Sequence, residues 1–278
     1  MKALAKFLCV VCFLGYVPIF ADSFTFSTGD PNGLVATASR LPQLGILGIE
    51  SADDFVLSLP TLIQHATFTG LITGTAPLSV DDVNIDLYHV FPLDSDTTRT
   101  PNVNTRVNSP ADTEFDGRSF SGGTLLFSTT VLNPSFTANN SILNGINPAP
   151  NQTTGGEGPV TGQEVLFDIV FTTPFDLPAG HYFFVPTIQI SGDEFFWLSA
   201  PKPIVAPGTP FAPDLQSWIR NQDLDPDWSR IGTDVIGAGA FNASFSLDGT
   251  TVPEPSTIWL LATCGGLSLL LFRRRTNS

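Results

Sequence analysis

One stretch of the chain decides the fold: Val83-Asn84-Ile85-Asp86-Leu87-Tyr88-His89-Val90-Phe91. Its apolar and polar side chains alternate, so that Ile85 and Leu87 lie on one side of an extended chain and Asn84 and Asp86 face the other way. Successive side chains of a β-strand point to opposite faces, so a period of two predicts a strand half buried against a core.

The same period recurs at residues 165–171 and, without a fault, at residues 241–247. Further strands are expected at residues 23–26, 34–38, 55–59, 66–72, 124–132, 181–190 and 195–199. About ten strands with turns marked by Pro and Gly predict an all-β fold, an antiparallel β-sandwich of jelly-roll or immunoglobulin-like type. The one short helix candidate in this body is residues 213–220. Long polar connections are expected at residues 93–123 and 133–162, and a third irregular stretch at residues 201–239.

Composition indicates how such a sandwich is held together. The 23 phenylalanines predict a phenylalanine-rich core. All three cysteines, Cys9, Cys12 and Cys264, lie in apolar segments near the two ends of the chain, so the body between them has no disulfide and no thiol nucleophile. About 230 residues separate the end segments, which is enough for one large sandwich or two smaller domains.

The charge of the body is strongly acidic. The end segments hold five of the 12 basic residues and one of the 26 acidic residues, which leaves 7 basic and 25 acidic side chains between them. A surface with this excess of negative charge repels phosphate backbones and keeps a protein soluble. Nucleic acid is therefore not an expected partner.

The N-terminus has the three parts of a secretory signal. Met1, Lys2 and Lys6 form a short basic region, residues 7–19 are an almost unbroken apolar run, and Ala21 supplies a small residue for cleavage. We therefore expect a signal peptide at residues 1–21, followed by a mature extracellular body at residues 22–252.

The C-terminus carries the most specific pattern in the chain. Pro253, Glu254 and Pro255 are followed by an apolar run at residues 258–272 and then by Arg273-Arg274-Arg275. Fifteen helical residues rise about 22 Å, so a transmembrane helix at 258–272 spans the bilayer only with help from its flanks. The arginines predict that this end stays in the cytoplasm and that the body lies outside.

This order of motif, apolar helix and basic cluster resembles the PEP-CTERM sorting signal of exopolysaccharide-producing Gram-negative bacteria. The resemblance implies a sorting signal at residues 253–278, in which Pro253, Glu254 and Pro255 are recognised by an exosortase, a membrane-embedded cysteine protease. The helix would hold the precursor in the inner membrane, with Arg273, Arg274 and Arg275 as stop-transfer anchor. After processing, the implied location is the outer surface or the extracellular matrix, with exopolysaccharide as a candidate partner.

Several phrases of the body also resemble uncharacterised PEP-CTERM proteins, a similarity that implies no activity. They include Thr28-Gly29-Asp30-Pro31-Asn32-Gly33, Glu50-Ser51-Ala52-Asp53-Asp54-Phe55, Trp197-Leu198-Ser199-Ala200-Pro201-Lys202-Pro203 and Asp214-Leu215-Gln216-Ser217-Trp218.

No catalytic residue is predicted. His65, His89 and His181 are far apart in the sequence and none belongs to a metal-binding spacing, and no Gly-x-Ser-x-Gly elbow occurs. The doublet Asp53-Asp54 cannot act as a glycosidase pair by itself, because neighbours on a strand point to opposite faces. The chain is therefore interpreted as a non-enzyme.

Calcium is the only cofactor that the sequence suggests. Asp223, Asp225 and Asp227 alternate as ligands do in a calcium loop, and Asp234 stands at the twelfth position from Asp223. Trp228, however, occupies the sixth position, where the usual loop has Gly, so the alternative is a solvated acidic loop.

Two tryptophans suggest a glycan site. Trp218 and Trp228 fall in the irregular stretch 201–239, and exposed aromatic rings bind sugars through apolar contact with the ring face. The alternative is that both rings pack loop against sheet. The leading hypothesis is an exported, non-catalytic surface or matrix protein, followed by a calcium- or polysaccharide-binding adhesion module and then by a secreted glycan-active enzyme.

Overall fold

The computed structural model describes residues 21–74, 79–146, 153–201 and 216–252. Within it, residues Ser23–Thr251 form one compact unit. The expected signal peptide, apart from Ala21, and the expected sorting signal with its helix at 258–272 lie outside the described residues. Pro253, Glu254, Pro255 and the three arginines at 273–275 are among the residues not described.

Two sheets make up this unit, which confirms the all-β class. The first has nine strands: β1 (Ser23–Ser27), β2 (Val35–Ala38), β4 (Thr61–Ile72), β7 (Leu125–Ala138), β8 (Asn140–Ile142), β9 (Val160–Leu177), β11 (Phe195–Ala200), β14 (Asn242–Ala243) and β15 (Phe245–Thr251). The second has six: β3 (Ile49–Leu57), β5 (Val80–His89), β6 (Asp116–Ser119), β10 (Gly180–Ile190), β12 (Trp218–Asn221) and β13 (Ser229–Arg230).

The order of the strands places β4 at the centre of the first sheet. One side of β4 pairs with β9, which pairs with β7, and the other side pairs with β15 and β11. The six-stranded sheet runs β13-β12-β3-β10-β5-β6 and is antiparallel. The first sheet is mixed, because β2 and β8 pair in parallel while its other strand pairs are antiparallel.

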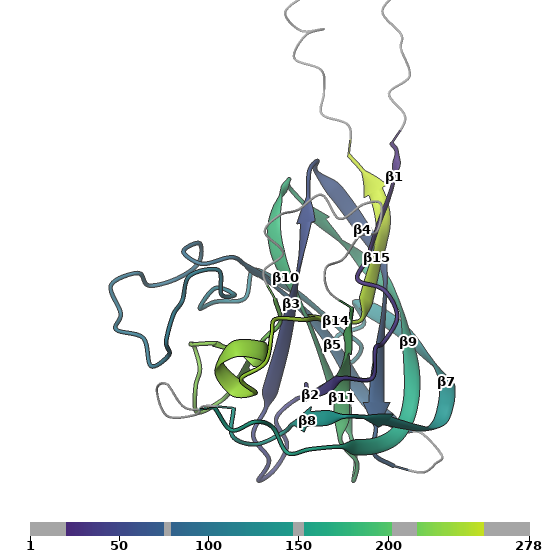
Figure 1. Ribbon diagram of the computed structural model, residues 1–278. Coiled ribbons are helices and arrows are strands. Elements are labelled where there is room, and N and C mark those ends of the chain that lie inside the picture. Colours follow the sequence, from purple (N-terminus) through teal and green to yellow (C-terminus); the bar gives the residue numbers. More distant parts are fainter. Residues whose placement is uncertain (1–20, 75–78, 147–152, 202–215, 253–278) are drawn as a thin grey trace, which may run out of the picture. The chain divides into compact units, whose positions relative to one another are not determined.

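The sheets face each other as the two layers of a sandwich, with β3 and β10 in one layer and β4, β9 and β7 in the other (Figure 1). Aromatic rings join the layers: Phe184 of β10 stacks on Phe245 of β15 with ring centroids 5.1 Å apart. The predicted phenylalanine-rich core is confirmed. Phe195 fits into it only because Gly70 has no side chain, since a Cβ there would lie 2.1 Å from the ring.

The irregular regions contain more structure than the sequence predicts. β6 lies in the expected loop 93–123 and β8 in the expected loop 133–162, and a short π-helix spans Ile231–Val235. The helix candidate at 213–220 is wrong at its described end, because Trp218 to Arg220 form a strand that pairs with Ala52 to Glu50 of β3. Four-residue strands are too short to show a period, so pairing with β3 decides their conformation.

Candidate functional site

The outer face of the six-stranded sheet, which points away from the main core, is covered. A small hydrophobic cluster, separate from the main core, lies on it and is made of Ala52, Tyr88, Phe183, Val185, Trp218 and Trp228. The loop of residues 90–115 and the segment around the π-helix lie on this side of β3 and β10 (Figure 1). Trp228, which precedes the π-helix, is hydrogen-bonded to the loop, because its indole N–H donates to the carbonyl of Ala111 at 3.2 Å. Polar side chains at neighbouring positions of this face are therefore partly removed from water.

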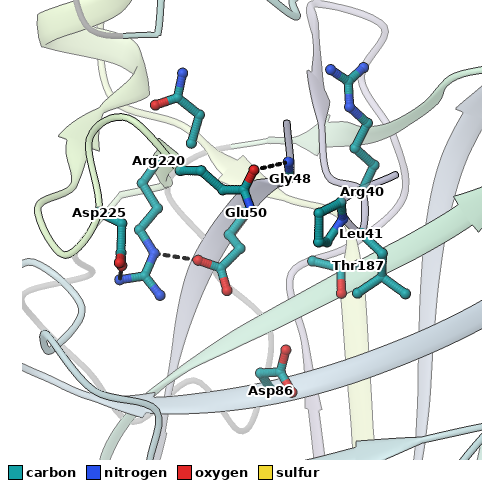
Figure 2. A pocket seen from close by; sticks show the side chains of 11 residues that line it. Arg40, Leu41, Gly48, Glu50, Asp86, Thr187, Arg220 and Asp225 are labelled. Atoms are coloured by element: carbon teal, nitrogen blue, oxygen red, sulfur yellow. Dashed lines mark hydrogen bonds and ion pairs between the residues drawn. The ribbon is translucent and has the colours of Figure 1, made fainter. Parts of the chain in front are cut away.

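A polar pocket of about 240 Å³ opens beside this cluster. Its walls come from the hairpin of residues 40–48, from the turn after β12, and from strands β3, β5, β10 and β12. The side chains that define its chemistry are Leu41, Glu50, Asp86, Thr187, Arg220 and Asp225. Figure 2 shows Glu50 and Asp86 pointing toward the same space, with Arg220 on one side and Leu41 and Thr187 on the other.

Among the described residues, Arg220 is the cation that pairs with carboxylates lining this pocket. Its guanidinium forms ion pairs with Glu50 and, at 2.9 Å, with Asp225. It also donates to the Tyr88 hydroxyl at 2.8 Å, and its guanidinium lies 4.3 Å from the centre of the Trp228 ring. Arg220 is thus fixed by four partners and has little freedom to serve another charge.

Among the described carboxyls that line the pocket, Asp86 is the one that forms no ion pair. Burial raises the pKa of Asp86 well above its usual range, and the negative charges of Glu114 and Glu50 raise it further, against the opposing effect of Arg220. Glu114 approaches from the loop before β6: a Cβ on Gly117 would lie 2.3 Å from Glu114 Oε1 and 2.7 Å from Asp86 Oδ1. The two carboxyls therefore share one crowded space that only a glycine leaves open.

Two buried oxygens without hydrogen-bond partners lie next to Asp86. Thr187 is 2% exposed, lines the pocket, and its hydroxyl Oγ1 has no partner. It pairs across strands with Asn84, whose Oδ1 is also buried and unpartnered. Buried polar atoms in native proteins are nearly always hydrogen-bonded, so two such atoms at one place need an explanation.

Replacement of Asp86 by asparagine is expected to stabilise the protein at neutral pH. Because the pKa of Asp86 is raised in the folded state, the native protein holds a proton that the unfolded chain has lost, and stability falls as pH rises above the unfolded value. Removing that ionisation should increase the free energy of unfolding by about 0.5–2 kcal/mol at neutral pH. Thermal melting of both proteins at about pH 4 and about pH 7 measures this, and the difference should shrink at the acidic pH.

The matched control is Asp81→Asn, a change at an exposed position of the same strand. It should leave the melting temperature unchanged at both pH values. A destabilised Asp86→Asn protein at neutral pH would contradict the expectation.

The four acidic residues considered for calcium are not brought together. The side chain of Asp227 is completely buried and is bound by Arg99 at 2.7 Å, whereas Asp234 pairs with Arg230 at 2.7 Å. Asp225 pairs with Arg220, and Asp223 is exposed. In the part of the chain that the structure describes, no group of three or more His, Cys, Asp or Glu side chains could hold a metal ion. Arginines therefore pair with three of the four carboxylates that the spacing suggested for an ion: Arg99 comes from a distant loop, and Arg220 and Arg230 are close in the sequence.

The two tryptophans considered for glycan binding are buried. Trp218 and Trp228 are each 1% exposed, so neither ring presents a face on which a sugar could stack. The exposure that this hypothesis needed is absent, and the alternative of packing loop against sheet is what the structure has.

The three histidines each contact a carboxylate, at three separate places. His65 lies between Asp168 at 2.7 Å and Asp248 at 3.4 Å on the open face of the first sheet, and its side chain is about one-third exposed. His181 pairs with Asp54 at 2.6 Å. Asp53, which precedes Asp54 in the sequence, points the other way, into the sandwich, and accepts a hydrogen bond from the Ala243 N–H. The two side chains of the doublet Asp53-Asp54 therefore lie on opposite faces of the strand, as expected.

Sequence reasoning missed the pocket as a site. The alternation at residues 83–91 correctly placed Asn84 and Asp86 on the face opposite Ile85, but it did not show that a loop covers this face. Arg220 was assigned to the helix candidate at residues 213–220. Thr187 lies in the expected strand 181–190, which has no alternation of polar side chains to mark it. The one available signal was a pair of acidic and amide side chains at alternate positions of an otherwise apolar strand.

In a comparison with protein families, the PEP-CTERM protein-sorting motif matches residues 251–275. The expected sorting motif is thereby confirmed, and it implies an exported, membrane-associated protein that is processed by an exosortase. No curated protein and no solved structure matches the chain. Within residues 21–74, 79–146, 153–201 and 216–252, no helix has the length and apolar character needed to cross a membrane.

Proposed function

We propose that this chain is a non-catalytic protein of the outer surface or extracellular matrix of a Gram-negative bacterium. It is exported, held in the inner membrane as a precursor, and separated from its tail by an exosortase. The observation that carries the proposal is the position of the sorting motif, whose match begins at Thr251, the last residue of the final strand β15.

The arrangement of the two terminal strands supports this reading. β1 begins at Ser23 and pairs with β15 over residues 246–250, so the first and last strands of the sandwich lie side by side. Cleavage after residue 21 and again near Pro253 would remove both end segments without taking a strand from either sheet. The product would be a soluble, acidic sandwich with an intact core.

Replacing Pro253, Glu254 and Pro255 together by alanine is expected to abolish processing. A protease that reads this motif loses its recognition element, so the full-length precursor should accumulate in the membrane fraction and the processed body should fall to background. Mass spectrometry of the protein from membranes, cell surface and medium measures both forms.

A Thr257→Ala change, just outside the three motif residues, serves as control and should be processed normally. The wild-type chain in a strain without exosortase should behave like the triple variant. Normal release of the triple variant, or normal release without exosortase, would contradict the proposal.

A further inference from the structure

The polar pocket has more carboxyls than cations at its base. The negative charges of Glu114 and Glu50 act on Asp86 there, and among the described residues Arg220 is the cation that opposes them. Arg220 is already paired with Glu50 and with Asp225. The other arginine of the pocket wall, Arg40, pairs with Glu194 at 2.6 Å. Within the described residues, Asp86 has no ion pair and no hydrogen-bond partner for its side chain.

The unpartnered hydroxyl of Thr187 gives a second and independent sign of a ligand. Thr187 is fully inside the fold and lines the pocket, yet its buried Oγ1 makes no hydrogen bond. A threonine could equally have been a valine of nearly the same shape if packing were its only role. A buried hydroxyl left unpaired costs free energy, and a ligand that donates to it would recover that cost.

We propose that this pocket binds a small ligand through a protonated primary amine, with the ammonium group at Asp86 and the Thr187 hydroxyl. An ammonium carries three donors, no acceptor and one positive charge, so on binding it would replace the proton that Asp86 holds and would donate to the Thr187 hydroxyl. This inference goes beyond the proposed surface role, because nothing in the export pathway requires a ligand.

Other ligand classes fit the pocket less well. An anion would meet Asp86, Glu50 and Glu114 while both arginines of the wall are already paired. A bare metal ion lacks a suitable set of ligands among the described side chains. A neutral polyol could donate to Thr187 but would bring no cation to stabilise the ionised form of Asp86. A volume of about 240 Å³ is enough for one amino-sugar ring or one lysine side chain.

The test is calorimetric titration of the full chain, purified in detergent, with three probes. Glucosamine and Nα-acetyl-lysine amide each carry one ammonium, and glucose is the neutral counterpart of the first. Both amines, or one of them, should bind, and glucose should bind about 10–100-fold more weakly, as expected for the loss of a charged hydrogen bond. If only glucosamine binds, the ligand is an amino sugar. If only the lysine amide binds, the ligand is a lysine side chain of a protein. Binding of both shows that the ammonium group alone is sufficient for recognition.

Three variants locate the site. Asp86→Asn should weaken amine binding by about 10–100-fold and Thr187→Val by about tenfold, because each removes one partner of the ammonium. Asp81→Asn removes one exposed charge from the same strand and should leave the affinity unchanged. Melting curves check that each variant is folded, and Asp86→Asn is expected to be at least as stable as the wild type.

Three results would overturn the proposal: no binding of either amine at millimolar concentration, equal affinity for glucose, or full affinity in Asp86→Asn or Thr187→Val. None of them bears on processing by the exosortase, which is measured in cells on the tail. Failure of the ligand proposal and failure of the proposed function are therefore separate outcomes.

Discussion

Replacing Asp227 by alanine is expected to lower the free energy of unfolding by about 3–5 kcal/mol, because it removes one partner of a buried ion pair. The Asp227 carboxylate accepts from Arg99 Nη1 at 2.9 Å and Nη2 at 2.7 Å, and from the Asn102 backbone N–H at 2.7 Å. Arg106 Nε lies 3.8 Å away. The variant would leave two guanidinium groups in a covered space with one carboxylate, Asp112, between them.

The effect should reach the whole loop of residues 90–115, because this loop has no strand of its own to hold it. Asp227 and Asp112 bind Arg99 and Arg106 from two sides, and this small network fixes the loop over the outer face of the six-stranded sheet. Limited proteolysis of the Asp227→Ala protein should therefore cut within this loop before the sandwich unfolds, and chemical unfolding measures the loss of free energy.

Acid should remove the same contribution from the wild type. Burial raises the pKa of Asp227, but the hydrogen bonds and charge of Arg99, with the Asn102 N–H and Arg106, outweigh it and hold the pKa below its usual range. A carboxyl with a lowered folded pKa stabilises the protein above its unfolded value and loses that contribution as pH falls through the folded value. The gap between wild type and Asp227→Ala should thus narrow below about pH 4.

Asp223→Ala is the matched control, since Asp223 is an exposed aspartate of the same acidic segment. Its effect should stay within about 0.5 kcal/mol, as for most surface substitutions. Equal destabilisation by both changes would show that the segment, and not the buried ion pair, carries the stability.

The sequence predicted the sandwich well because burial of one strand face leaves a direct trace in a period of two. Val165, Phe167 and Ile169 are all buried in the core, as their spacing indicated. Some strands were predicted too short: β9 was expected to end at Phe171 but extends to Leu177. Pairing with β4 holds the extra residues in place although their own pattern is irregular.

The candidate site could not be predicted because its members meet only through tertiary packing. Glu50, Asp86, Thr187 and Arg220 come from four strands, and neither their spacing nor their types form a motif. The acidic segment 223–234 shows the opposite case. Its spacing looked like an ion-binding loop, but arginines at positions 99, 220 and 230 pair with its carboxylates instead. The spacing of residues in a segment shows which candidate ligands are present, but it does not show which cations pair with them in the folded protein.

Replacing Phe68 by alanine is the second change for which we expect a loss of about 3–5 kcal/mol, the usual cost of deleting a buried aromatic side chain. Phe68 is 1% exposed and lies on the central strand β4. Its ring stacks on Phe167 with centroids 4.7 Å apart, meets Phe195 edge-on at 6.0 Å, and contacts Phe184 of the opposite sheet at 6.3 Å. The cavity would therefore open where the two sheets meet.

The control for this change is Phe120→Ala, because Phe120 is also in an edge-on ring pair, with Phe127 at 4.9 Å, but is 41% exposed. Chemical unfolding of the two variants should give a loss several times larger for Phe68 than for Phe120. Similar losses in the two variants would mean that ring pairing, and not burial between the sheets, dominates the stability of this sandwich.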